Sequence, residues 1–195
     1  MRSVAKYSSL IFHPVIFALL IPFILVYRQT TDVGYALKWM AFSSLFLLLT
    51  IIIFYFVRPK EFFSDFDIAK KENRIGFYGI ACGIAILYFI VAVLFKGIFF
   101  PLSILALGII IAIVVFEIAN FYSKVSIHVA SACAYVVTIG ILYGPVAFLL
   151  SWWIAPLVAW SRIYLKKHTT KEAAAGAILG CIVTVITFLI AKLLL

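Results

Sequence analysis

The sequence predicts an all-α protein, a polytopic bundle of about six or seven membrane-spanning helices. Of its 195 residues, 67% are hydrophobic and only 12% are charged, whereas a soluble domain carries about 25% charged residues. Several apolar runs reach about 20 residues, the length that crosses a hydrocarbon core of about 30 Å. Backbone polar groups inside lipid must be satisfied within their own segment, so these runs are expected to be helices.

Hydropathy divides the chain into seven apolar segments. The first follows a short basic stretch and is longer than the core of a signal peptide, so we expect it to be retained as a helix. Lys96-Gly97 predicts a tight turn between the third and fourth segments, and Gly144-Pro145 predicts another between the fifth and sixth. The segments cover about residues 8–27, 36–57, 76–95, 98–121, 127–143, 145–163 and 172–194.

Neither a long soluble insertion nor a tandem repeat interrupts these segments. We therefore expect one transmembrane domain over residues 1–195, with its core at about 58–195 and two N-terminal helices within 8–57. The three cysteines lie inside apolar runs without paired spacing, which predicts neither a disulfide nor a metal site. The sequence assigns no oligomeric state.

Three polar stretches are expected on one face of the membrane. They are residues 58–74, 122–128 and 161–172, and two apolar segments separate each stretch from the next. Because crossing the membrane twice returns the chain to the side it left, all three stretches can converge on one site.

The basic residues favour the same face. It would hold twelve of the sixteen Lys and Arg residues, which by the positive-inside rule places it in the cytoplasm. The net charge of +9 predicts membrane lipids with anionic headgroups, or anionic substrates, as partners rather than nucleic acid. The short loops favour a prokaryotic plasma membrane.

The last polar stretch carries the clearest chemical pattern, S-R-x5-H-x3-E, from Ser161 to Glu172. If a helix begins near Thr170, Glu172 lies in its first turn and can accept a hydrogen bond from His168, which suits a nucleophilic imidazole. Arg162 offers a planar fork of donors that matches phosphate oxygens. The small residues from Ala173 to Gly180 permit another helix to approach closely behind this stretch.

The other two stretches add candidate ligands. Ser126 stands at the start of an apolar segment, where its hydroxyl can either cap a helix or bind an anion, and His128 could donate a proton to a departing alkoxide. Lys124 precedes them. Lys71 and Arg74 lie three residues apart, on one side of a helical turn.

The pattern from Ser161 to Gly180 resembles the third signature of the type 2 phosphatidic acid phosphatase superfamily, S-R-x5-H-x3-D followed by small residues. "VSIH" resembles its second signature, P-S-G-H, with Val125 and Ile127 in place of proline and glycine. The first signature, K-x6-R-P, is not present as such, although "KKENR" resembles a variant with two basic residues three apart. The resemblance covers about residues 64–185.

The resemblance implies a lipid phosphate phosphatase that needs no metal or other cofactor and acts through a phosphohistidine. His168 would attack phosphorus, Glu172 would orient it, and His128 would protonate the leaving lipid alkoxide. The implied substrate is a polyprenyl phosphate or diphosphate, or a phosphatidyl-type lipid. The implied phosphate ligands are Lys71, Arg74, Lys124, Ser126 and Arg162.

Two other functions and several simpler interpretations stay open. A lipid phosphotransferase would use the same residues and pass the phosphoryl group to an alcohol, whereas a lipid-binding or transport protein would keep the anion site without hydrolysis. His168 and Glu172 can also be a polar pair at the membrane boundary, and Lys71 and Arg74 can be ordinary positive-inside residues. His13, which begins an apolar segment far from the other signals, is assigned no role.

Overall fold

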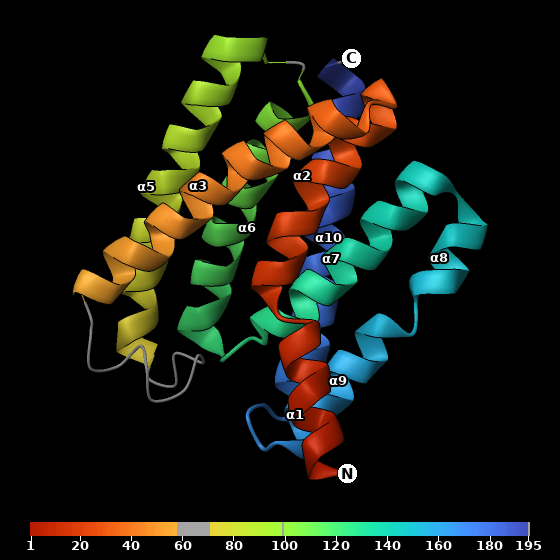
Figure 1. Ribbon diagram of the computed structural model, residues 1–195. Coiled ribbons are helices and arrows are strands. Elements are labelled where there is room, and N and C mark those ends of the chain that lie inside the picture. Colours follow the sequence, from red (N-terminus) through yellow and green to blue (C-terminus); the bar gives the residue numbers. More distant parts are fainter. Residues whose placement is uncertain (58–70, 99, 195) are drawn as a thin grey trace. The chain divides into compact units, whose positions relative to one another are not determined.

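The structure of the protein is a computed structural model that describes residues 1–57, 71–98 and 100–194, without the side chains of 71–75 and 194 (Figure 1). Every regular element in the described ranges is a helix, which confirms the all-α prediction. The helices are α1 (Arg2–Ile11), α2 (Pro14–Thr30), α3 (Val33–Val57), α5 (Lys71–Lys96), α6 (Pro101–Tyr122), α7 (Ile127–Tyr143), α8 (Pro145–Ser151), α9 (Ile154–Tyr164) and α10 (Thr170–Leu194).

Six helical stretches of the described chain are long and apolar enough to cross a membrane, which agrees with a polytopic integral membrane protein. Two of these stretches combine consecutive helices, α1 with α2 and α8 with α9. The apolar helix α7 has 17 residues and is shorter than the six.

The described residues form two compact units. One unit contains Met1–Ile21 and Ser123–Leu193, and so holds α1, the start of α2, and α7 to α10. The other contains Pro22–Tyr122, with the rest of α2 and the helices α3, α5 and α6. The boundary within α2 falls at Pro22, a residue that cannot donate a backbone hydrogen bond to the preceding turn. Single-domain organisation stays a prediction.

In the unit that contains α3, α5 and α6, aromatic side chains dominate the packing. Asp32 begins α3 as its cap, since its carboxylate accepts the backbone N–H of Tyr35 at 3.0 Å. The ammonium group of Lys96, in the last turn of α5, lies 5.4 Å from the ring centre of Tyr35 and 5.9 Å from that of Trp39. The buried core here consists of Val26, Ala36, Tyr88, Leu102 and Ala106.

Two segments that the sequence predicts as single helices are each divided in two, and a proline explains both breaks. Pro14 has no N–H and disfavours helical backbone at His13, so α1 ends before it and α2 starts at it. Pro156 cannot donate to the carbonyl of Trp152, four residues earlier, and its ring would clash with that carbonyl. The chain accordingly leaves the helix at Trp152 and Trp153 and resumes as α9.

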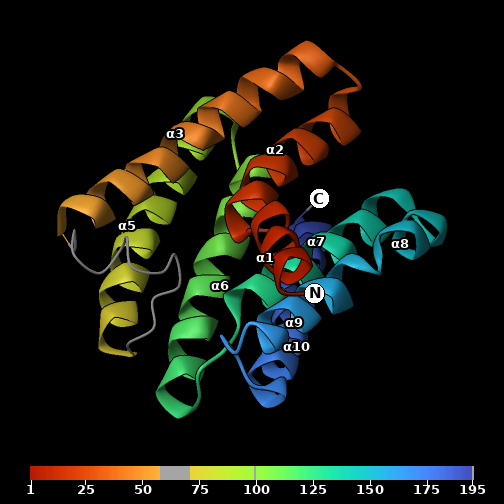
Figure 2. The ribbon, with the colours of Figure 1, turned by 60° about the horizontal axis from the view of Figure 1, so that its bottom comes forward.

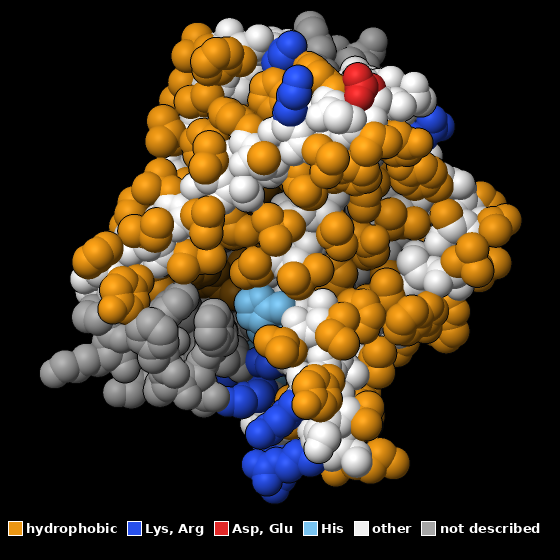
Figure 3. All heavy atoms as spheres, viewed as in Figure 1, with side chains coloured by type: hydrophobic (Ala, Val, Ile, Leu, Met, Phe, Trp, Pro, Cys, Tyr) orange, Lys and Arg blue, Asp and Glu red, His pale blue; other side chains and the backbone are white. Residues whose placement is uncertain are grey.

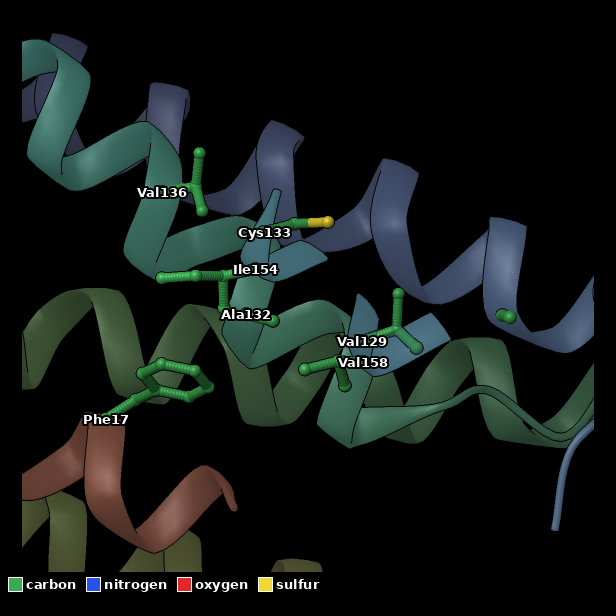
Figure 4. Close-up of a cluster of buried hydrophobic side chains, with 8 residues drawn as sticks. Phe17, Val129, Ala132, Cys133, Val136, Ile154 and Val158 are labelled. Carbon is green, nitrogen blue, oxygen red and sulfur yellow. The ribbon is translucent and has the colours of Figure 1, made fainter. Parts of the chain in front are cut away.

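The core of the first unit joins four helices (Figure 4). Phe17 of α2 and Ile154 of α9 pack with side chains from one face of α7, and Ala173 of α10 belongs to the same cluster. These residues are buried although their helices are apolar all round, so close packing rather than amphipathic patterning selects the inner face. The other members are Val129, Ala132, Cys133, Val136 and Val158.

Two glycines of α10 bring its backbone against that of α7, as the run of small residues predicts. A Cβ atom at Gly176 would lie 2.5 Å from the carbonyl oxygen of Ser126, and one at Gly180 would lie 2.3 Å from that of Ala130. No real Cβ makes such contacts with backbone, so glycine is required at both positions. The start of α7 and the start of α10 are held together by this contact.

Candidate active site

The spacing between Arg162 and His168 is set by the way α9 ends. The backbone N–H of Lys166 donates to the carbonyl of Ile163 at 2.9 Å, and that of Lys167 donates to the carbonyl of Arg162 at 3.0 Å. These two bonds form a Schellman motif, which requires left-handed backbone at the residue after the cap. Lys166 supplies it with a φ of 56°, at a cost of about 1 kcal/mol relative to glycine. The chain thereby turns back at once, and the backbone N–H of His168 donates to the carbonyl of Arg162 at 3.3 Å.

His168 then stands directly before a capping box that starts α10. The Thr169 hydroxyl accepts the backbone N–H of Glu172 at 3.2 Å, and the Glu172 carboxylate accepts the backbone N–H of Thr169 at 3.2 Å. This reciprocal pair satisfies two helix-end donors. It also fixes the Glu172 carboxylate, since the same oxygen that caps the helix lies 2.9 Å from Nδ1 of His168.

The hydrogen bond between His168 and Glu172 determines the tautomer of the imidazole. An ionised carboxylate can only accept, so Nδ1 carries the hydrogen and the lone pair of the neutral ring is on Nε2. The His168 side chain is 2% exposed and the Glu172 side chain 22% exposed. The pair is therefore a buried, oriented imidazole with a carboxylate that reaches the surface.

Arg162 is buried and its guanidinium is fixed by the N-terminal helix. Nη1 donates to the hydroxyl of Ser9 at 2.9 Å, and Arg162 as a whole is 5% exposed. Ser8 and Ser9 are on the buried face of α1, together with Ala5. The neighbouring Ser161 is fully buried and its hydroxyl donates to the carbonyl of Val158 at 2.8 Å, so this serine serves its own helix.

The second polar stretch meets the third within the same unit. The backbone N–H of Ser126 donates to the carbonyl of Glu172 at 3.2 Å, and the ammonium of Lys124 donates to the carbonyl of Lys167 at 3.2 Å. Ser126 occupies the N-cap position of α7, but its hydroxyl makes no capping bond. Ser126 is fully buried, and its hydroxyl oxygen has no hydrogen-bond partner among the described residues. Of the two roles open to Ser126, capping is therefore not used.

His128 lies in the first turn of α7, 6% exposed, and is surrounded by basic groups. Arg162, His13 and His168 are all within electrostatic range of its ring. Its ring centroid is 4.8 Å from that of His13, and the two rings are perpendicular. Three imidazoles and one guanidinium therefore gather at the start of α7 and α10.

Lys and Arg side chains are exposed beside imidazole atoms on one face of the molecule. On the face drawn in Figure 3, imidazole atoms are visible beside a group of Lys and Arg side chains. In the ribbon views the N-terminal helix α1 lies next to α9 and the α9–α10 connection (Figures 1 and 2).

The first polar stretch is not placed at the site. Residues 58–70 lie outside the described part of the chain, and so do the side chains of Lys71 and Arg74 at the start of α5. Their predicted contact with phosphate stays a prediction. Of the eight predicted site residues, the structure describes six in one unit, namely Lys124, Ser126, His128, Arg162, His168 and Glu172.

Two residues at the site, Ser9 and His13, are not found by reasoning from the sequence. Both come from the N-terminal segment, more than a hundred residues from the second and third signatures. The only available signal is the pair His13-Pro14 inside an apolar segment, because an ionisable side chain at membrane depth suggests a function. Serines on the buried face of a short helix give no such signal.

Within the described residues, no cluster of three or more His, Cys, Asp or Glu side chains is arranged to hold a metal ion. The three cysteines are free thiols, and Cys133 belongs to the apolar core.

Comparison with known protein families, with curated proteins and with solved structures found no match for this chain.

Proposed function

We propose that this protein is an integral-membrane lipid phosphate phosphatase that acts through a phosphohistidine on His168. The observation that carries the proposal is the His168–Glu172 pair, a buried imidazole whose Nδ1 is bound to a carboxylate at 2.9 Å. Buried Arg162 and the unpartnered hydroxyl of Ser126 are in the same unit. Phosphoryl transfer depends on such positioning and on neutralisation of charge.

The first chemical step follows from the tautomer of His168. Nε2 attacks phosphorus, the bond between phosphorus and the lipid oxygen breaks, and the positive charge that develops on the imidazole is stabilised by Glu172 through Nδ1–H. In the second step water attacks phosphorus and gives a proton to His128, which lost one to the lipid alkoxide; the N–P bond breaks, and inorganic phosphate leaves. Glu172 does not move between the steps, because the capping box holds its carboxylate.

The phosphoryl oxygens would be held by donors from the end of α9 and from the connection that leads into α7. Arg162 brings a permanent positive charge that is already positioned by Ser9. Ser126 brings a hydroxyl whose burial without a partner is unfavourable by about 1–3 kcal/mol, and a bound phosphate oxygen would remove this penalty. Lys124 is close, since its ammonium contacts the carbonyl of Lys167, the residue before His168.

His128 would act as the acid for the leaving lipid. A lipid alkoxide is a poor leaving group, so a proton delivered as the phosphorus–oxygen bond breaks accelerates the reaction by about 10²–10⁴-fold. Bound phosphate adds negative charge beside His128 and so favours the protonated ring that this step needs. No residue in this scheme requires a metal ion or another cofactor.

The substrate is expected to be a phosphomonoester or diphosphate on a hydrophobic chain, either a polyprenyl or a phosphatidyl-type lipid. Six helical stretches of the described chain are long and apolar enough to cross a membrane, which favours a substrate that arrives within the membrane. A cytoplasmic orientation of the site in a prokaryotic plasma membrane is proposed from the distribution of Lys and Arg alone.

The test is phosphate release by the purified protein from a panel of polyprenyl and phosphatidyl lipid phosphates, in the presence of EDTA. We expect inorganic phosphate to appear at the same rate with and without the chelator. Release that stops in EDTA would contradict the proposal, because the scheme uses side chains alone. Labelled phosphate that appears on an added polyol instead of in solution would indicate a phosphotransferase. Binding of lipid phosphate without turnover would indicate a transport or binding protein.

A further inference from the structure

We propose that His13 is a positioning residue, which holds the ring of His128 in the orientation needed to protonate the leaving group. This inference rests on the proposed phosphatase function and extends it to a residue outside the three polar stretches. Two observations carry it. The imidazole of His13 is held by a hydrogen bond from the backbone, whereas the imidazole of His128 makes no hydrogen bond to the described residues.

His13 is fixed because its side chain caps α2. It occupies the position before Pro14, the first residue of that helix, and its Nδ1 accepts the backbone N–H of Val15 at 3.3 Å. The backbone carbonyl of His13 accepts the N–H of Ile16 at 2.9 Å in the same turn. Since Nδ1 is the acceptor, the hydrogen of the neutral ring is on Nε2.

His128 contrasts with this. Among the described residues it makes no hydrogen bond to the protein, although it is 6% exposed and sits at the start of a well-packed helix. The terminal torsion of a histidine is broad, so a ring without hydrogen bonds can rotate and carry its nitrogens away from the substrate. A general acid has to stay within hydrogen-bond reach of the oxygen that it protonates.

The perpendicular contact with His13 limits that rotation. The ring centroids are 4.8 Å apart at an interplanar angle of 90°, which is the favourable edge-to-face arrangement for aromatic rings. A hydrogen bond from a carbonyl or carboxylate would orient His128 equally well, but it would occupy one of its nitrogens. Orientation by a ring leaves both nitrogens of His128 for the substrate.

A purely structural role for His13, as a helix cap, makes different predictions for two substitutions. In His13→Asn the side chain still offers a capping oxygen but has no ring. In His13→Phe the ring is kept and the capping acceptor is lost. A capping role predicts that the Phe variant is impaired and the Asn variant is normal, and a positioning role predicts the reverse for turnover.

The experiment compares an alkyl phosphate, whose alkoxide needs a proton to leave, with p-nitrophenyl phosphate, whose phenolate leaves without one. For His13→Asn we expect kcat on the alkyl phosphate to fall about 10-fold with KM unchanged, because the acid is misplaced. Its kcat on p-nitrophenyl phosphate should stay within about twofold of the wild type, since that reaction does not use the acid. His13→Phe should keep more of its kcat on the alkyl phosphate than His13→Asn does, because the ring that contacts His128 is kept even though the cap that fixes it is lost.

A double-mutant cycle with His128→Ala separates an effect of His13→Asn on the acid from an effect on the stability of the protein. Where His128 is already absent, His13→Asn should cause no further loss on the alkyl phosphate. The inference is overturned if His13→Asn turns over both substrates like the wild type, if both rates fall equally, or if the two substitutions act additively. It would fail separately from the proposed function in each case, because the wild-type protein would still release phosphate. If the wild type releases phosphate from neither substrate, the proposed function itself is wrong.

Discussion

Phosphate release from lipid phosphates should fall by at least about a thousandfold when His168 is replaced by alanine, because the attacking atom is removed. No described residue is arranged to replace it. His128 and His13 are close, but the carboxylate at the site is bound to His168 through Nδ1. The measurement is the initial rate of phosphate release in detergent or in vesicles, with the folded fraction checked by thermal unfolding.

Two further variants make this result specific. Lys171→Ala removes an exposed cation three residues from His168 that is no part of the site, and its rate should equal that of the wild type. Glu172→Gln keeps an oxygen for the capping box but removes the negative charge that stabilises the imidazolium. It should fold normally and lose less activity than His168→Ala. Substantial turnover by a folded His168→Ala protein would exclude His168 as the nucleophile.

Gly180→Ala is expected to destabilise the protein and to reduce its activity together. The added Cβ would lie 2.3 Å from the carbonyl oxygen and 2.9 Å from the carbonyl carbon of Ala130, so α7 and α10 have to separate. Overpacking of this kind costs about 1–3 kcal/mol. Because α7 carries Ser126 and His128 whereas α10 carries Glu172, the separation would also widen the site. Thermal unfolding and phosphate release of the same preparation measure both effects.

Gly83→Ala is the matched control for this prediction. Gly83 lies in the interior of α5, and a Cβ there would meet nothing within 4 Å. A helical glycine that gains a methyl group without a clash stabilises its helix by about 0.5–1 kcal/mol. A Gly180→Ala protein that unfolds at the same temperature as Gly83→Ala would show that α7 and α10 do not pack as described.

The apolar runs predict most of the helices because, in lipid, length and hydrophobicity alone determine whether a segment is a helix. The spacing from Arg162 to Glu172 is equally local. In this spacing α9 ends with left-handed backbone at Lys166, His168 follows, and a capping box then starts α10. Hydrogen bonds between residues close in sequence stabilise both helix ends. Such patterns can be read from a sequence, since every contact lies within a few residues.

Contacts between distant segments cannot be read in the same way. Ser9 binds Arg162 and His13 contacts His128 only because α1 packs against α9 and the start of α7. A uniformly apolar helix does not indicate which of its faces is buried, and two serines on the buried face of a short helix do not indicate which segment they contact. Hydropathy does not predict the breaks at His13 and at Trp152–Trp153 for a related reason. It is an average over many residues, so the single prolines that cause the breaks hardly change it.

The role of His168 is tested most directly by quenching the protein at high pH during turnover of a lipid phosphate and locating covalent phosphate by mass spectrometry. Phosphohistidine survives alkali, so we expect one phosphoryl group on the peptide that contains residues 168–172, attached to the imidazole, and none in the His168→Ala protein. A phosphoryl group on a different residue, or steady phosphate release with none bound to His168, would contradict the mechanism.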